Sequence, residues 1–151
     1  MKEKILFSLS VIIIMILTTY ISMLPPRGVN TVEFETVAKG QYSGISERNT
    51  FVINTKEEWI SFLNKFKSDE EKNELDNVTF EEGTYTFVAV TMYENQTTGY
   101  GIEIREIYNF PNYLKLDIYQ EVPCAGCILE SKITRPFHII KLSKTNKEIR
   151  R

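Results

Sequence analysis

The sequence contains few of the residues that most often carry chemistry. Its 151 residues include one histidine, His138, and two cysteines, Cys124 and Cys127. Catalysis of the Ser/His/Asp or Cys/His type would have to use His138, which has no nucleophile motif beside it and is better interpreted as an ordinary strand residue. A zinc site needs about four ligands, and no glycine-rich phosphate loop occurs. These residues lead us to expect a protein that is not an enzyme, with no catalytic residues, no metal and no cofactor, while a redox role of the two cysteines stays open.

An excess of positive charge is also missing. The first 27 residues hold three of the 18 basic residues and one of the 20 acidic ones, which leaves the remainder more acidic than basic by four. Nucleic-acid binding depends mainly on positive charge, so a nucleic-acid partner is not expected. The basic segment at residues 145–151 is interpreted as a frayed C-terminal tail.

Charged residues are absent from one long stretch, residues 5–24. As a helix this stretch would rise about 30 Å, the thickness of a bilayer's hydrocarbon core. A cleaved signal peptide would have a shorter apolar stretch with small residues at its end, so a retained anchor is favoured over cleavage. Lys2 and Lys4 precede the stretch, and the preference for basic residues on the cytoplasmic side predicts a single-pass cell-membrane protein with an extracytoplasmic domain.

The residues that follow the apolar stretch suffice for one domain with a core of its own. We assign residues 1–27 to the signal or membrane anchor and 28–39 to a tether and first strand. Residues 40–144 form the predicted domain, and 145–151 are the basic tail. The sequence shows no internal repeats and no low-complexity segments.

One segment of the domain has the pattern of an amphipathic helix. In "TKEEWISFLNKF" (residues 55–66), Thr55 and Glu58 have the spacing of a capping box. Apolar residues recur at helical spacing along this segment, which is typical of a face that packs into a core. They are Trp59, Ile60, Phe62, Leu63 and Phe66. We expect Trp59, Leu63 and Phe66 to be structural core residues rather than ligand contacts.

Most other segments have the patterns of strands. Alternating or continuous apolar residues predict about six of them, at residues 31–38, 50–54, 85–93, 100–108, 113–120 and 136–142. Turn chemistry at residues 109–112 joins two strands into a hairpin. The expected fold is α+β, mainly an antiparallel sheet or a small barrel-like sheet with one amphipathic helix, preceded by an N-terminal transmembrane helix.

The two cysteines in "PCAGC" (residues 123–127) leave three possibilities open. In an oxidising compartment, nearby thiols tend to form a disulfide, which would pin a turn here. A thioredoxin-like redox pair stands at the N-terminus of a helix, whereas the segment after Cys127 looks extended. A metal site lacks further ligands. We favour a local Cys124–Cys127 disulfide and keep a thiol–disulfide oxidoreductase as the alternative.

Several short motifs follow one another in an order that is similar to a known family. The helix carries Glu-Trp, a Gly-Tyr turn opens a later strand, and a Thr-x-Pro-Phe-His-Ile run comes near the end. The matching positions are Glu58, Trp59, Gly99, Tyr100, Ile102, Ile104, Thr134, Pro136, Phe137, His138 and Ile139. Over residues 40–144 the chain resembles the C-terminal domain family of PrcB, a bacterial protease-complex subunit. Thr79 and Thr98 depart from that pattern, which has aspartate and glycine there.

The resemblance implies an extracytoplasmic accessory domain with no established catalytic residues. We therefore predict a membrane-anchored domain that binds a protein partner, such as a secreted or surface protease. Thr97, Gly99 and Tyr100 are the candidate contact residues, because exposed tyrosines at loop edges are favoured in interfaces. Two other functions stay open. One is the oxidoreductase, and the other is a ligand-binding module that uses the Thr97–Tyr100 turn near peptidoglycan or lipid.

Overall fold

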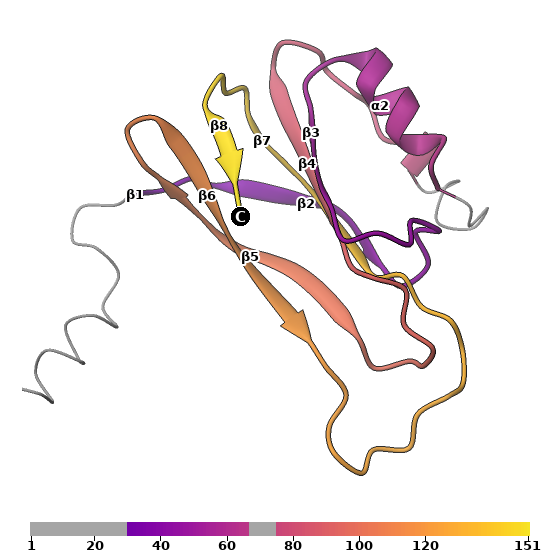
Figure 1. Ribbon diagram of the computed structural model, residues 1–151. Coiled ribbons are helices and arrows are strands. Elements are labelled where there is room, and N and C mark those ends of the chain that lie inside the picture. The colour runs from indigo at the N-terminus through magenta and orange to yellow at the C-terminus, as the bar shows by residue number, and fades with distance from the viewer. Residues whose placement is uncertain (1–29, 67–74) are drawn as a thin grey trace, which may run out of the picture. The chain divides into compact units, whose positions relative to one another are not determined.

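Eight strands and one labelled helix make up the part of the chain that the computed structural model describes, residues 30–66 and 75–151 (Figure 1). The predicted membrane segment at residues 5–24 lies outside these residues. Within the described ranges, no helix has the length and apolar character that crossing a membrane requires. The anchor and its orientation therefore stay predictions.

The strands form two four-stranded sheets. Sheet A has the order β1-β5-β6-β8, and sheet B has the order β2-β7-β4-β3. The bounds in sheet A are Asn30–Thr31, Gly101–Asn109, Tyr113–Glu121 and Glu148–Arg150, and those in sheet B are Phe34–Gly40, Phe137–Ser143, Tyr85–Thr91 and Thr50–Ile53. The ladders β2–β7, β7–β4, β4–β3 and β5–β6 are antiparallel. The prediction of a mainly antiparallel fold with one short helix is confirmed.

Sheet B is the middle layer, because both of its faces are covered. Phe87 and Ala89 of β4 belong to a core cluster shared with the helix, whereas Val88 and Val90 belong to a second cluster shared with sheet A. A strand buried on both faces needs a continuous apolar run rather than an alternating one. The run at residues 85–91 has that character, and its last six residues, Thr86 to Thr91, are fully buried.

The helix α2 spans Lys56–Leu63 and begins with the predicted capping box. Thr55 Oγ1 accepts a hydrogen bond from the Glu58 N–H, and the Glu58 carboxylate accepts one from the Thr55 N–H, at 3.2 Å each. Trp59, Leu63 and Phe66 are buried. The interpretation of Ile60 as part of the same stripe is wrong, because its side chain is 49% exposed. The buried face is narrower than the apolar pattern suggested.

The N-terminal strand segment contributes to both sheets. β1 pairs with β5 in sheet A, and after two intervening residues β2 pairs with β7 in sheet B. The Val32 N–H donates to the carbonyl oxygen of Ile107 at 2.8 Å, which ties the connection to sheet A. A register shift between Thr36 and Ala38 breaks the alternation expected along this segment.

The C-terminal residues are a strand rather than the frayed tail that the sequence predicted. β8 pairs in parallel with β6, with Glu148 opposite Tyr113 and Arg150 opposite Lys115. The Arg151 side chain donates to Thr50 Oγ1 at the start of β3. The residue after β8 in sheet A is thus linked by a side-chain bond to the outer strand of sheet B.

Candidate functional site

The turn predicted to contact a partner and the loop that carries the cysteines lie against each other. The Thr98 N–H donates to the Glu130 carbonyl oxygen at 3.1 Å, and the Glu130 N–H donates to Thr98 Oγ1 at 3.2 Å. The Thr134 hydroxyl donates to the Thr97 carbonyl oxygen at 3.0 Å. We call residues 97–100 and 122–134 the loop cluster. Thr97, Gly99, Tyr100 and both cysteines all belong to it.

Gly99 is the residue that lets the two loops approach each other. Its φ of +92° lies in the left-handed region that favours glycine. A Cβ at this position would lie 3.1 Å from Leu129 Cδ2 and 3.3 Å from Pro123 Cγ. Tyr100 is half-buried and packs against the core between the sheets. The turn therefore has a clear structural role, and only part of Tyr100 is accessible.

Cys124 and Cys127 lie in a tight turn with their sulfur atoms at bonding distance. Their Cα atoms are 5.4 Å apart, and the Cys127 N–H donates to the Cys124 carbonyl oxygen at 3.2 Å. Gly126 supplies the left-handed residue of the turn, with a φ of +85°. No helix follows Cys127 in the described chain. The helix dipole that lowers the thiol pKa in thioredoxin-like sites is therefore not available here.

The loop cluster exposes apolar side chains that the sequence analysis did not single out. Val122, Ile128 and Ile133 are exposed, and Ile128 is accessible over its whole side chain. Isolated exposed apolar residues are common, but these three share one loop. The sequence signal that could have predicted their exposure is their position among Pro, Gly and Ser, in a segment that lacks the alternation of a strand.

The base of the loop is held by side-chain and backbone bonds. Arg135 donates to the Glu94 carboxylate through Nε at 3.0 Å and also through a terminal nitrogen. The Arg135 carbonyl oxygen accepts from the Ser43 N–H and hydroxyl, at 3.1 and 2.9 Å. Both nitrogens donate to the same carboxylate oxygen of Glu94, Oε2, and such charge-assisted bonds are stronger than neutral ones. The C-terminal end of the loop that carries Ile128 is therefore held in a defined position.

Part of the chain, including the loop cluster, is similar to a known protein family. Residues 86–143 match the family model described as PrcB C-terminal. The predicted resemblance to the PrcB C-terminal family is confirmed over these residues. They run from β4 to β7 and include the whole loop cluster, whereas the helix with its Glu58-Trp59 pair lies outside the match. No curated protein and no solved structure matches the chain.

His138, in the PrcB-like region, is a buried link between the two sheets. Its side chain is 2% exposed. Nδ1 accepts a hydrogen bond from the Ile104 N–H of β5 at 2.9 Å, and Nε2 lies 3.0 Å from Thr36 Oγ1 of β2. Because Nδ1 is an acceptor, the proton of the neutral ring is on Nε2, which donates to Thr36. The ring cannot take a proton from this hydroxyl, so the pair is not a nucleophile and its base.

The environment of His138 keeps its ring neutral. The pKa of His138 is lowered from 6.5 to about 4, mainly by burial and also by the positive charge of Lys39, while the negative charge of Glu103 acts in the opposite direction. Lys39 and Glu103 form an ion pair with a 3.2 Å N–O distance. The neutral ring accepts a hydrogen bond from the Ile104 N–H, a buried backbone group that would otherwise lack a partner.

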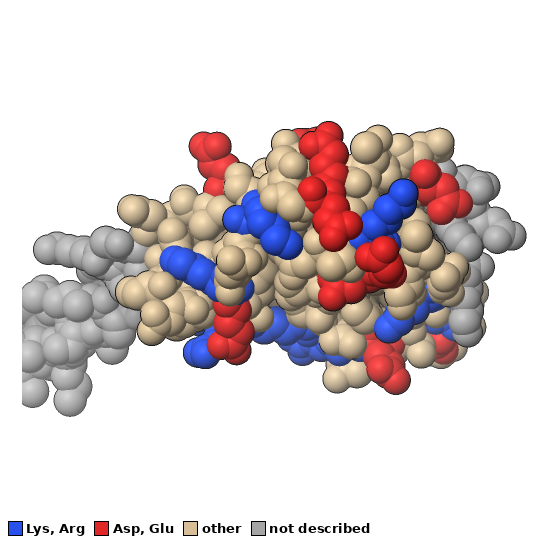
Figure 2. Space-filling view, turned by 90° about the horizontal axis from the view of Figure 1, so that it is seen from above, with Lys and Arg blue, Asp and Glu red and all other residues tan. Residues whose placement is uncertain are grey.

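Charged residues and potential metal ligands are dispersed over the described part of the chain. Within residues 30–66 and 75–151, no group of three or more His, Cys, Asp or Glu side chains could hold a metal ion. Figure 2 shows acidic and basic side chains interspersed over the described part of the visible face. A surface of this kind offers no broad field of one sign to a charged ligand.

Proposed function

We propose that this protein is a non-enzymatic accessory domain that binds a protein partner through the loop cluster, and that the partner is part of a protease complex. The match of residues 86–143 to the PrcB C-terminal family supports the class of partner. The loop cluster lies inside the matched residues. An extracytoplasmic domain held by the predicted anchor at residues 5–24 completes the proposal.

The observation that carries the proposal is a fully exposed isoleucine on a loop with a fixed base. Burying one such side chain in an interface contributes roughly 1.5–3 kcal/mol. A loop that is already ordered loses less conformational entropy on binding than a mobile one. Three features hold the loop in place. They are the close approach of Gly99 to Pro123 and Leu129, the Thr98–Glu130 hydrogen bonds and the Glu94–Arg135 ion pair.

Co-purification from native membranes tests the binding surface. Ile128→Ser should lower the recovery of the partner by about tenfold or more, because tenfold corresponds to roughly 1.4 kcal/mol. Ile60→Ser is the matched control, since it removes an equally apolar exposed side chain from the helix. Equal recovery with both variants would contradict a role for the loop cluster.

The location is tested separately on intact, wall-stripped cells. We expect the full-length chain in the membrane fraction, with the C-terminal strand open to added protease. A mature protein that begins near residue 25 and is soluble in the medium would rule out the anchor. Protection of the C-terminus would rule out the orientation.

A further inference from the structure

The outer strand of sheet B leaves backbone hydrogen-bonding groups at an open edge. β3 pairs with β4 on one side, and among the described residues no strand lies on its other side. The Thr91 N–H donates to the Asn49 carbonyl oxygen at 3.0 Å. Antiparallel pairing alternates, so Phe51 and Ile53 direct their backbone groups to β4. The N–H and C=O of Val52 then face the open edge.

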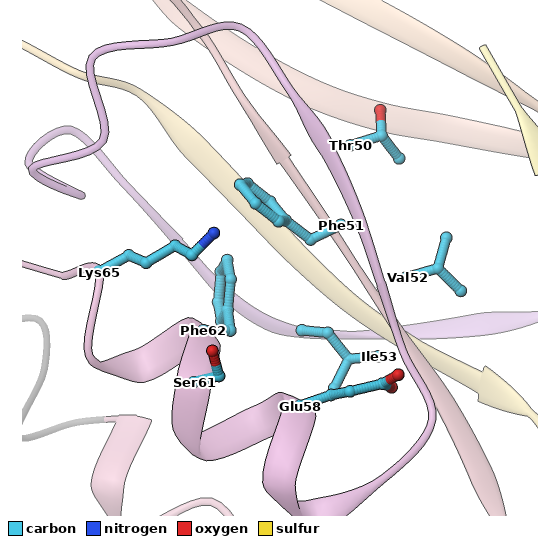
Figure 3. A pocket seen from close by; sticks show the side chains of 8 residues that line it. All are labelled: Thr50, Phe51, Val52, Ile53, Glu58, Ser61, Phe62 and Lys65. Atoms are coloured by element: carbon cyan, nitrogen blue, oxygen red, sulfur yellow. The ribbon is translucent and has the colours of Figure 1, made fainter.

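A groove of about 330 Å³ runs beside this edge, between β3 and α2. Figure 3 shows Phe51 and Ile53 pointing toward the helix, while Thr50 and Val52 point the other way. The rings of Phe51 and Phe62 lie with their centroids 5.2 Å apart and form the apolar wall. The groove thus combines a strand edge with a place for one apolar side chain.

The two ends of the groove carry opposite charges. The Lys65 amine lies 4.9 Å from the centre of the Phe51 ring, near the start of β3. Arg151 binds Thr50 at the same end of the strand. At the other end the Glu58 carboxylate accepts from the Asn54 N–H at 2.7 Å. An added antiparallel strand would therefore bring its N-terminal side to Glu58 and its C-terminal side to Lys65.

We propose that this groove binds the C-terminal segment of a partner polypeptide as an added antiparallel strand on β3, with its terminal carboxylate at Lys65. Such strand addition obtains affinity from backbone bonds and specificity from side-chain pockets. The Thr50 N–H, which faces the open edge, already donates to Asn49 Oδ1 at 2.8 Å, and Arg151 binds the Thr50 side chain. An added strand has to end there, which favours a chain terminus over an internal segment. The groove shares no residue with the loop cluster, so either proposal can fail without the other.

Peptide titration of the ¹⁵N-labelled full-length protein in detergent tests this proposal. The probe is an acetylated six-residue peptide of threonine and valine, with phenylalanine next to a free C-terminal carboxylate. We expect shifts at the amides of Phe51, Val52 and Lys65. A peptide whose backbone amide opposite Val52 is N-methylated should bind at least tenfold more weakly. Shifts confined to other parts of the protein, or equal binding of the N-methylated peptide, would overturn strand addition.

Charge variants test the recognition of the carboxylate. Lys65→Gln should weaken binding of the free acid about 2- to 5-fold, the range for an exposed ion pair, and leave the C-terminal amide unaffected. Lys56→Gln removes the same charge at the exposed start of the helix and should change neither peptide. An amidated peptide that ends in aspartate and binds as tightly as the free acid would overturn the assignment to a chain terminus.

Discussion

Acidification should destabilise this protein through His138. The pKa of its ring is lowered from 6.5 to about 4 in the folded chain. Above pH 6.5 the ring is neutral in both states and its protonation does not affect stability. Below pH 6.5 the unfolded chain gains the proton first, so the free energy of unfolding falls until about pH 4. At roughly 1.4 kcal/mol per pH unit, the total loss is about 3 kcal/mol, a large share of a small domain's stability.

His138→Asn separates this effect from the titration of carboxylates. The asparagine oxygen can stand near the position of Nδ1 and accept the Ile104 N–H, but the amide does not titrate. The variant loses the contact to Thr36 and some volume, so it should be less stable at pH 7. Between pH 6.5 and 4, however, its free energy of unfolding should fall less steeply than that of the parent.

The measurement is urea unfolding of both full-length proteins across this pH range, followed by fluorescence of the single tryptophan. Trp59 lies in the core, so its emission reports unfolding. Parallel curves for parent and variant would refute the argument, because the carboxylates titrate in both. A midpoint near 6.5 for the His138 ring protons in NMR would refute it directly.

Three further outcomes are expected. Trp59→Ala should lower the free energy of unfolding by about 3–5 kcal/mol, measured by circular dichroism, and a parent-like midpoint would contradict its core role. Protein purified without reductant should have an intact mass about 2 Da below the dithiol value. Changing Cys124 and Cys127 to serine should lower the melting temperature only modestly, because the loop that the disulfide closes is so short. A dithiol mass or a strongly depressed pKa of Cys124 would reject the disulfide. Gly99→Ala should destabilise more than Gly83→Ala, because both have positive φ but only the first meets neighbouring side chains; equal melting temperatures would show that the loop contact carries no energy.

Local signals made parts of this fold predictable. The capping box of α2 depends on residues three apart, and the continuous apolar run of β4 depends on neighbours alone. The exposure of Ile60 could not be predicted from such local signals. Trp59 and Ile60 differ by one position on the helix, and which of them meets the sheet is decided by distant strands. Apolar periodicity predicted a face but not its width.

Non-local pairing accounts for what the sequence left hidden. β8 has one apolar residue, Ile149, and becomes a strand because β6 offers a parallel partner about 35 residues earlier. The loop cluster depends on contacts between residues 97–100 and 122–134, which no local pattern records. His138 looked like an ordinary strand residue because its partner, the Ile104 N–H, belongs to the other sheet.

The position of β7 in sheet B has a consequence for the order of folding. β7 lies between β2 and β4, yet it follows both of them in the chain, and Phe34 pairs with Leu142 across about a hundred residues. Until β7 has been synthesised, β2 has no partner in sheet B and β4 has only β3. Pairings over such distances form slowly and leave apolar strands exposed in the meantime. A nascent chain that ends before residue 137 should therefore remain unfolded in sheet B, although it already contains the helix and most of the strands.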